Sequence, residues 1–331
     1  MGKFHAAKLT SSPDVDFIGC FDIVSDKAQE VASEFNCRVF RSLTEFIGEV
    51  KAVCIAVPTQ NHLECSLPFL ENRVAVLLEK PIAPDLDSAE KIVEAARKNN
   101  AVLQIGHSER FNPVYQAARL KIDKPRFVET HRLASFKGRG HDVAVILDLM
   151  IHDIDLLLDI IGSEPSSVEA AGVGVITDTL DIVNARLTFP TGCVANITAS
   201  RISLKEMRKL RVFQKSGYIS MDMASSELES FILTEPDSPL AKNAGLFSRF
   251  NLPDGRVIVR EDIDIPSTDS LQLEINSFID AVKGKHPPAV SGEAGFSALK
   301  VAKHIEQPVS YTHLRAHETS LHLVCRLLLE K

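Results

Sequence analysis

The sequence predicts an α/β protein of two domains, of which the first contains a doubly wound parallel sheet. A chain of 331 residues exceeds the usual size of one domain and can bury a substantial core. In the first third, short apolar runs alternate with segments of helical periodicity, which is the pattern of a parallel sheet covered by helices. From residue 168 onward several segments read as successive strands, and these favour a second sheet.

The elements of the first domain follow from local patterns. Its strands are the short apolar runs Val15–Phe21, Ala52–Val57, Val74–Leu78 and Ala101–Ile105. Its helices are the periodic segments Lys3–Leu9, Ser25–Phe35, Gln60–Glu71 and Leu86–Asn99. Asp85 and Asp87 lie at the start of the last helix, where either carboxylate could accept hydrogen bonds from free amides.

The second domain is expected to be rich in strands. They are Val168–Ile176, Asp181–Phe189, Val194–Ser200, Leu210–Gln214 and Tyr218–Met221, with a turn at Thr191 and Gly192. A helix is expected over Gly292–Ile305. We therefore divide the chain into a first domain at 1–108, a second at 109–307, and a tail at 308–331 that is expected to be non-native sequence.

Composition excludes several classes of function. A net charge of −7 without a stripe of Lys and Arg argues against nucleic-acid binding. The longest apolar segment, Val143–Ile161, contains too many ionisable side chains for a lipid-spanning helix, and no secretory signal is visible. Six cysteines without metal-ligand spacing indicate small buried side chains in a reducing compartment, so we expect a cytoplasmic protein without a metal site.

The most informative local feature is the end of the predicted strand Val74–Leu78, which runs directly into Glu79, Lys80 and Pro81. Open α/β sheets bind ligands at the carboxyl ends of their strands, so a lysine there is a candidate for catalysis. On residue identity alone, a solvated Glu and Lys closing an ordinary strand explain the same letters. Other motifs in the chain are therefore needed to choose between these two interpretations.

A second candidate cluster is Asp148, His152 and Asp155, which follow one another at i, i+4 and i+7 and would share one face of an α-helix. An imidazole flanked by carboxylates can act as a base near neutral pH. Two other readings remain open at this point. The helix could be structural with satisfied polar groups, or Asp148 and His152 could join His141 in a metal site.

The beginning of the chain indicates a nucleotide-binding turn. Gly2, which precedes a helical segment, could be the third glycine of a GxGxxG turn whose first strand and first two glycines are missing from the chain. Asp22 ends a strand about 20 residues later, where an acidic group binds the adenosine ribose and disfavours a 2′-phosphate. Asp22 could equally cap the turn into the next helix. NAD is thus expected over NADP, with weak or no binding by this truncated chain.

Three motifs in combination resemble the Gfo/Idh/MocA oxidoreductases, the family of glucose-fructose oxidoreductase and inositol dehydrogenase. They are Glu79-Lys80-Pro81, the DxxxHDID pattern of Asp148–Asp155, and Gly106-His107 leading into Arg110–Pro113. The resemblance covers about residues 2 to 306. It implies a Rossmann domain followed by an α/β domain with an open, mostly antiparallel sheet that often mediates a homodimer or homotetramer.

The resemblance also implies roles for individual residues. Lys80 would hydrogen-bond the reacting hydroxyl, His152 would remove its proton, and Asp148 would orient His152 or the substrate. The residues expected to line the NAD site are Gly2, Asp22, Thr59, Asn61, His62, Glu79 and Lys80. Helix capping is the competing role for Thr59, Asn61 and His62.

The segment Gly106–Pro113 resembles most closely the branch acting on nucleotide-linked amino sugars, such as UDP-N-acetylglucosamine 3-dehydrogenases. The substrate would then meet Arg110, Asn112, Lys137 and Arg201, although Arg110 could instead pair with Glu109 or Asp153. An inositol or free-sugar dehydrogenase is the alternative, as is an enzyme with tightly bound NADP that couples two sugars. From a different class, a non-catalytic sensor that binds NAD and a sugar would have no use for a Lys and His pair.

Overall fold

The computed structural model describes residues 1–136, 143–245, 248–307 and 309, and its mixed α/β architecture confirms the predicted fold class. The chain forms two compact units. Unit 1 contains Met1–Asn112 and Ser267–Leu299, and unit 2 contains Pro113–Pro266 and the described residues from Lys300 onward. The expected division at residue 108 is thus incomplete, because the chain returns to unit 1 over residues 267–299. The expected tail, apart from Val309, lies outside the described residues.

Unit 1 is built on short parallel strands. A three-stranded sheet has the order β3 (Ala52–Ile55), β4 (Ala75–Glu79), β5 (Leu103–Gly106). A separate parallel pair consists of β1 (Gly19–Cys20) and β2 (Arg38–Val39), so the predicted strand Val15–Phe21 is much shorter than expected. The helices are α1 (Gly2–Ser11), α2 (Ser25–Phe35), α3 (His62–Glu71), α4 (Leu86–Asn99) and α8 (Ser270–Val282), with 3-10 turns η1 (Leu43–Phe46), η2 (Thr59–Asn61) and η3 (Ser108–Phe111).

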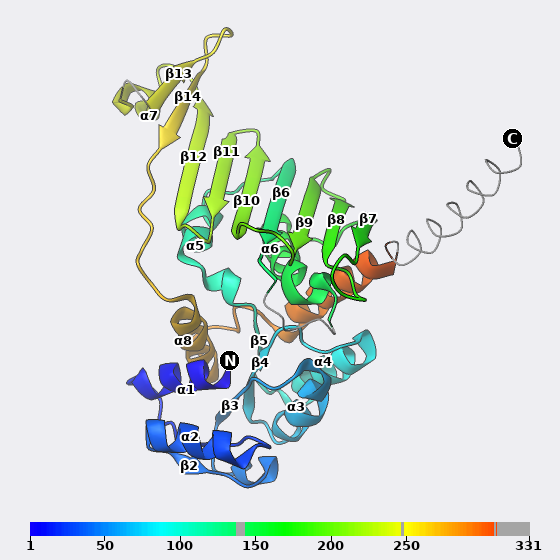
Figure 1. Cartoon of the computed structure of the whole chain (residues 1–331). Coiled ribbons are helices and arrows are strands. Elements are labelled where there is room, and N and C mark those ends of the chain that lie inside the picture. Colours follow the sequence, from blue (N-terminus) through cyan, green and yellow to red (C-terminus); the bar gives the residue numbers. More distant parts are fainter. Residues whose placement is uncertain (137–142, 246–247, 308, 310–331) are drawn as a thin grey trace, which may run out of the picture. The chain divides into compact units, whose positions relative to one another are not determined.

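The core of unit 1 joins segments that are distant in sequence. Ile275 and Phe278 on α8 pack against Ala75 and Leu77 on β4, and all four side chains are buried. In Figure 1, α1 and α8 lie on one side of β3–β5, and α3 and α4 lie on the other. Helices on both faces are what a parallel sheet with near-continuous apolar strands requires.

Helix α4 shows how closely local sequence controls this unit. Asp85 accepts a hydrogen bond from the Ser88 amide at 2.8 Å, so it is Asp85 rather than Asp87 that caps the helix. At the other end Asn100 adopts a left-handed conformation, with φ of 51°, and stops it. The predicted bounds of this helix are confirmed.

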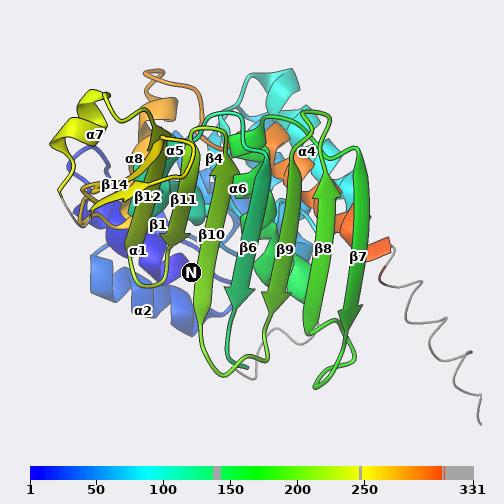
Figure 2. The same ribbon diagram turned by 90° about the horizontal axis from the view of Figure 1, so that it is seen from above.

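Unit 2 contains a nine-stranded sheet in the order β13-β14-β12-β11-β10-β6-β9-β8-β7 (Figure 2). Neighbouring strands are antiparallel except β6 and β9, which are parallel. The strands are β6 (Phe127–Leu133), β7 (Ser167–Val173), β8 (Ile182–Thr188), β9 (Val194–Ser200), β10 (Met207–Gln214), β11 (Gly217–Asp222), β12 (Glu227–Thr234), β13 (Arg249–Asn251) and β14 (Val257–Glu261). The five strands expected here correspond to β7–β11.

Helices cover one face of this sheet (Figures 1 and 2). They are α5 (Pro113–Arg119), the π-helix η4 (Ile146–Met150) and α6 (Ile151–Ile161), while α7 (Pro239–Asn243) packs on β14. On β6 the alternation of side chains turns Val128, Thr130 and Arg132 to the buried face. In the described part of the chain no helix is long and apolar enough to span a bilayer.

Candidate functional site

The carboxyl end of β4 carries the candidate site residues of unit 1. Strands β3, β4 and β5 run parallel, with Leu78 paired to Ile105 and Glu79 paired to Gly106. Lys80 follows directly, is half-buried, and is joined to Pro81 by a cis peptide bond. The sequence therefore places an ammonium group at the sheet edge where parallel α/β folds bind their ligands.

Glu79 is held in place by α1 and by its neighbour strand. Its Oε1 lies 2.7 Å from Nε2 of His5, and these side chains are only 13% and 3% exposed. A Cβ on Gly106 would come within 3.2 Å of the Cα of Glu79, tighter than nearly all real contacts. Glycine at 106 thus leaves room for Glu79, and the His5 pair fixes the residue that precedes Lys80.

His62 braces the loop that follows Lys80. Its ring is fully buried, with Nδ1 3.0 Å from the carbonyl oxygen of Pro81 and Nε2 3.1 Å from that of Val57. Burial lowers the pKa of His62, and the neighbouring carbonyls oppose the shift only in part. These contacts give His62 a bracing role between two loops, and they do not support the expected contact with cofactor.

Asp22, Thr59 and Asn61 each follow a parallel strand of unit 1, whereas Gly2 lies at the start of α1. Asp22 follows β1, is exposed, and accepts a hydrogen bond from the Val24 amide at 2.8 Å. Thr59 and Asn61 form η2 after β3, and the exposed side chain of Asn61 makes no capping bond to α3. Gly2 begins α1, but a Cβ there would meet no atom within 4 Å, so close packing does not explain this glycine.

These residues suit a dinucleotide in their chemistry. Asp22 offers an exposed carboxylate for ribose hydroxyls, and the first amides of α1 lie at a helix N-terminus, which attracts phosphate. Lys80 supplies a cation at the sheet edge. Asp22, the first amides of α1 and Lys80 are therefore chemically suited to NAD, although nothing packs closely enough around Gly2 to require a glycine there.

In unit 2, Asp148 and His152 lie on either side of a change in helix type. Asp148 belongs to η4, and His152 to the first turn of α6. The predicted α-helical face is therefore wrong for this turn, because a π-helix has more residues per turn. Asp148 and His152 are half-buried, whereas Asp155 is 1% exposed and belongs to the core side of α6. Short π-turns within α-helices are frequent at functional sites.

Helix α6 is fixed to the sheet by a buried ion pair beside His152. Asp153 accepts two hydrogen bonds from Arg132 of β6, at 3.1 and 2.9 Å, and the two side chains are only 2% and 5% exposed. Near the other end, Asp159 accepts from Tyr115 and Arg119 of α5. Arg132 is thus a partner of Asp153 that joins α6 to β6.

The residues expected to bind substrate fall into different environments. Arg110 is half-buried in η3, and Asn112 is 9% exposed and donates to Glu109 at 3.3 Å. Arg201 is 5% exposed, and its guanidinium serves protein acceptors, so its placement does not support substrate contact. Lys137 lies outside the described residues. Among the described residues, no three His, Cys, Asp or Glu side chains gather in metal-binding reach.

Sequence reasoning missed three buried polar residues that contact the site or the elements that carry it: His5, Arg132 and Asp181. Arg132 carried a usable signal, since its place in β6 puts it on the same face as Val128, and a cation on that face needs a partner. His5 and Asp181 show no comparable signal, because their partners are far along the chain or in an irregular loop.

Comparison with known proteins agrees with this architecture. Residues 1–107 match a family model described as "Oxidoreductase family, NAD-binding Rossmann fold", and residues 118–220 match the "GFO/IDH/MocA C-terminal domain". UDP-N-acetylglucosamine 3-dehydrogenase of Acidithiobacillus ferrooxidans is 34% identical over 93% of this chain and 94% of its own length. Inositol 2-dehydrogenase of Rhizobium meliloti is 25% identical over 91% of this chain and 92% of its own.

Solved structures give the same picture. The structure of the Acidithiobacillus ferrooxidans enzyme superposes with a TM-score of 0.83 over 93% of this chain and 94% of that one. A probable dehydrogenase from Thermotoga maritima, 22% identical, shares the fold with a TM-score of 0.76 over 94% of each chain. With both domain models matched and one relative similar from end to end, the chain belongs to the Gfo/Idh/MocA family of oxidoreductases, whose first domain binds NAD.

Proposed function

We propose that this protein oxidises a secondary hydroxyl of a nucleotide-linked amino sugar, at C3 of UDP-N-acetylglucosamine, and passes the hydride to NAD. The observation that carries the proposal is the position of Lys80, directly after β4 at the carboxyl edge of a parallel sheet and behind the locked pair of His5 and Glu79. The substrate is taken from the relative that matches 93% of the chain.

The chain's own residues handle the hydroxyl and its proton. Lys80 donates a hydrogen bond to the reacting oxygen, which stabilises the negative charge that develops there. His152 takes the proton, and Asp148 keeps the ring of His152 in a productive orientation. NAD, when bound, accepts the hydride at its nicotinamide. The products are then a ketone, NADH and a proton on His152.

Residues of unit 1 account for the choice of cofactor. The carboxylate of Asp22 accepts hydrogen bonds from ribose hydroxyls and repels a 2′-phosphate, which favours NAD over NADP. Thr59 and Asn61 follow β3 and line the nicotinamide end, with Glu79 and Lys80 after β4. NADP is therefore expected to be the poorer substrate at equal concentration.

For the sugar nucleotide, Arg110 is the described cation that we assign to the diphosphate. A free polyol such as inositol carries no such anion. Because an inositol dehydrogenase is also a relative, inositol is the proper comparison substrate. If kcat/KM is higher for inositol than for the nucleotide sugar, inositol becomes the proposed substrate, and the proposed dehydrogenase activity stands.

We also propose that a second copy of the chain covers the open face of the sheet in unit 2. Aromatic rings form a continuous row across four strands there, with centroids 4.9 to 6.0 Å apart between neighbours: Phe127, Phe213, Tyr218 and Phe231. Phe213 remains 36% exposed. Such a row favours association, and light scattering should report a dimer or tetramer that Tyr218→Lys weakens.

The five described cysteines are free thiols, and Cys193 is buried. We infer a reducing, cytoplasmic location from this pattern. A reporter fusion that tracks the protein to the cytoplasmic fraction would agree, and disulfides in protein purified without reductant would contradict it.

The decisive experiment follows NADH formation by purified protein with NAD and UDP-N-acetylglucosamine. Lys80→Met and His152→Asn should each lower kcat/KM by roughly 100-fold or more. Lys91→Met and His286→Asn are matched controls, since both side chains are exposed away from the site, and they should retain activity. Activity that survives both site variants would overturn the mechanism. Tight NAD and sugar binding without NADH formation would indicate a sensor.

A further inference from the structure

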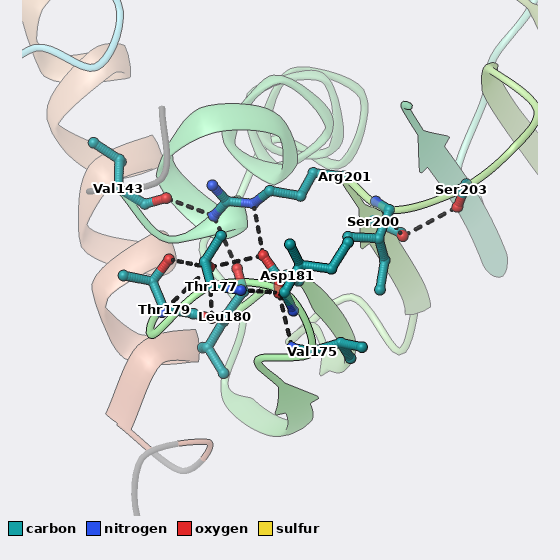
Figure 3. A network of polar contacts seen from close by, with 11 residues as sticks. Val143, Val175, Thr177, Thr179, Leu180, Asp181, Ser200, Arg201 and Ser203 are labelled. Carbon is teal, nitrogen blue, oxygen red and sulfur yellow. Dashed lines mark hydrogen bonds and ion pairs between the residues drawn. The ribbon is translucent and has the colours of Figure 1, made fainter. Parts of the chain in front are cut away.

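A buried cage surrounds the carboxylate of Asp181 in unit 2 (Figure 3). Three successive amides, of Val175, Ile176 and Thr177, donate to its Oδ2 at 2.8, 2.7 and 3.0 Å, and the Thr177 hydroxyl donates to Oδ1 at 2.8 Å. Burial raises the pKa of Asp181, but these hydrogen bonds outweigh it and lower the pKa to about 2. Asp181 is fully buried and is therefore a fixed negative charge.

Arg201, the residue after β9, lies against this cage. Its Nε is 3.5 Å from Oδ1 of Asp181, and its backbone amide donates to the Asp181 carbonyl at 3.0 Å. Its Nη2 donates to the carbonyl oxygens of Leu180, at 2.9 Å, and of Val143 (Figure 3). Arg201, at the end of β9, thus contacts both the loop at Leu180 and the segment at Val143.

That segment leads directly into the helix of the candidate site. The amide of Val145 donates to the Leu180 carbonyl at 3.0 Å, so residues 143 and 145 are both bonded to the group around Arg201 and Asp181. Residue 146 begins η4, which carries Asp148, and α6 follows with His152. The start of η4 is therefore held by Arg201 and by Leu180, and not only by its own helical bonds.

We propose that Arg201 and Asp181 form a clamp that positions the start of η4, and through it Asp148 and His152, for proton transfer in the proposed reaction. Arg201 is a positioning residue and does not touch substrate. The inference rests on the proposed function for its effect on turnover, while the clamp itself is a property of unit 2.

The clamp and the ion pair between Arg132 and Asp153 act on different parts of the helix. Arg132 holds α6 one residue beyond His152, whereas Arg201 holds the chain three residues before η4. Both contacts are with residues outside the helix, so each fixes the position of one end of the segment that carries His152. Small misplacement of a proton-transfer group lowers turnover steeply, on the order of 100-fold for about 1 Å.

The test compares Arg201→Met with Arg119→Met in the full-length protein. Arg119 pairs with Asp159 near the far end of α6, and so its loss removes an ion pair from the same helix without touching η4. Arg201→Met should lower kcat by roughly 10- to 100-fold, with KM for both substrates within about threefold of wild type. Arg119→Met should leave kcat unchanged. Arg201→Lys should recover part of kcat, because an ammonium keeps the ion pair but not both carbonyl contacts.

Hydrogen exchange gives a second readout that does not depend on activity. Arg201→Met should raise exchange at amides 145–152 and leave amides 156–161 protected, and Asp181→Asn, which keeps the side-chain shape, should act in the same direction. Unchanged exchange and unchanged kcat in both variants would overturn the clamp. A lower melting temperature with full kcat would do so as well, since that is the outcome for a merely structural pair.

Failure of the clamp and failure of the proposed function are distinguishable. If wild-type protein binds NAD and the sugar nucleotide but shows no dehydrogenase activity, the proposed function fails, and exchange at amides 145–152 still decides whether Arg201 holds η4. If His152→Asn abolishes activity while Arg201→Met changes neither kcat nor exchange, the proposed function stands and the clamp is wrong.

Discussion

His5 and Glu79 are 74 positions apart in sequence, yet Nε2 of the ring lies 2.7 Å from Oε1 of the carboxylate. The contact joins the first turn of α1 to the end of β4, one residue before Lys80. A carboxylate so little exposed needs a partner, because an unpaired buried charge is costly. The geometry at Lys80 therefore depends on a residue near the start of the chain.

Replacing His5 with Phe should destabilise the protein, because the ring shape is kept while Glu79 loses its partner. We expect a loss of about 1–3 kcal/mol in the free energy of unfolding, measured by urea titration. Lys3→Ala is the control on the same helix: Lys3 pairs with Glu30 and Glu34 on the exposed surface, so its removal should matter little. Equal effects of the two changes would contradict the structural role of His5.

Glu274 on α8 should make stability fall as pH rises. Its side chain is 1% exposed, and neither carboxyl oxygen has a hydrogen-bond partner among the described residues. Burial, and after it the charge of Glu79, raises the pKa of Glu274 well above its usual value. The folded protein then holds a proton that the unfolded chain releases above about pH 4.3. The stabilising effect is complete below that pH and is lost as pH rises toward the folded pKa.

Glu274→Gln removes this titration. Relative to wild type, the variant should gain stability with rising pH by up to about 1.4 kcal/mol per pH unit, until the folded pKa is passed. Thermal unfolding measured from pH 5 to pH 8 checks this slope. Glu293→Gln, at an exposed position of the following helix, should run parallel to wild type.

The buried ring of His62 should have the opposite pH dependence. Its pKa is lowered in the folded state, chiefly by burial, so below about pH 6.5 the unfolded chain binds a proton that the folded protein resists. Stability is complete above that pH and declines as pH falls toward the folded pKa. His62→Gln should cost about 1–3 kcal/mol at pH 8 but flatten this acid limb, whereas His286→Asn should retain it. If His62→Gln loses stability at low pH just as wild type does, another group is responsible for that loss.

The buried pair of Arg132 and Asp153 should be strongly coupled. Arg132→Met removes the buried cation that contacts Asp153, beside His152, and we expect a loss of about 3–5 kcal/mol. Adding Asp153→Leu should restore much of that loss, because the double variant buries no charge. A double-mutant cycle from denaturant titrations gives the coupling energy, and additive effects of the two changes would show that the pair is not coupled.

Local patterns predicted the elements whose ends are set locally. Both ends of helix α4 were predicted to the residue. The side chain of Asp85 caps its start, and the left-handed backbone of Asn100 ends it. The strands β7–β11 were predicted because alternation is visible wherever one face of a sheet is covered. Lys80, Asp148 and His152 were singled out by motif, and their combined role remains a proposal.

Features that depend on distant residues were not predictable in the same way. Nothing within Ile146–Met150 distinguishes a π-turn from an α-turn, since its start is held by Arg201, more than 50 residues later. His62 and Arg201 were assigned to ligands because an isolated sequence does not show which carbonyl groups will meet them. The return of residues 267–299 to unit 1 was not predicted, because an apolar helix face does not show which sheet it will cover.

That return has a consequence for synthesis on the ribosome. The core of unit 1 needs Ile275 and Phe278, which are translated about 200 residues after Ala75 and Leu77. Until α8 has emerged, β4 exposes an uncovered apolar face, while residues 113–266 of unit 2 are already available to fold. Unit 2 is also completed late, because its described residues from Lys300 onward follow α8, so nascent chains stalled before residue 270 should present unit 1 to chaperones and proteases.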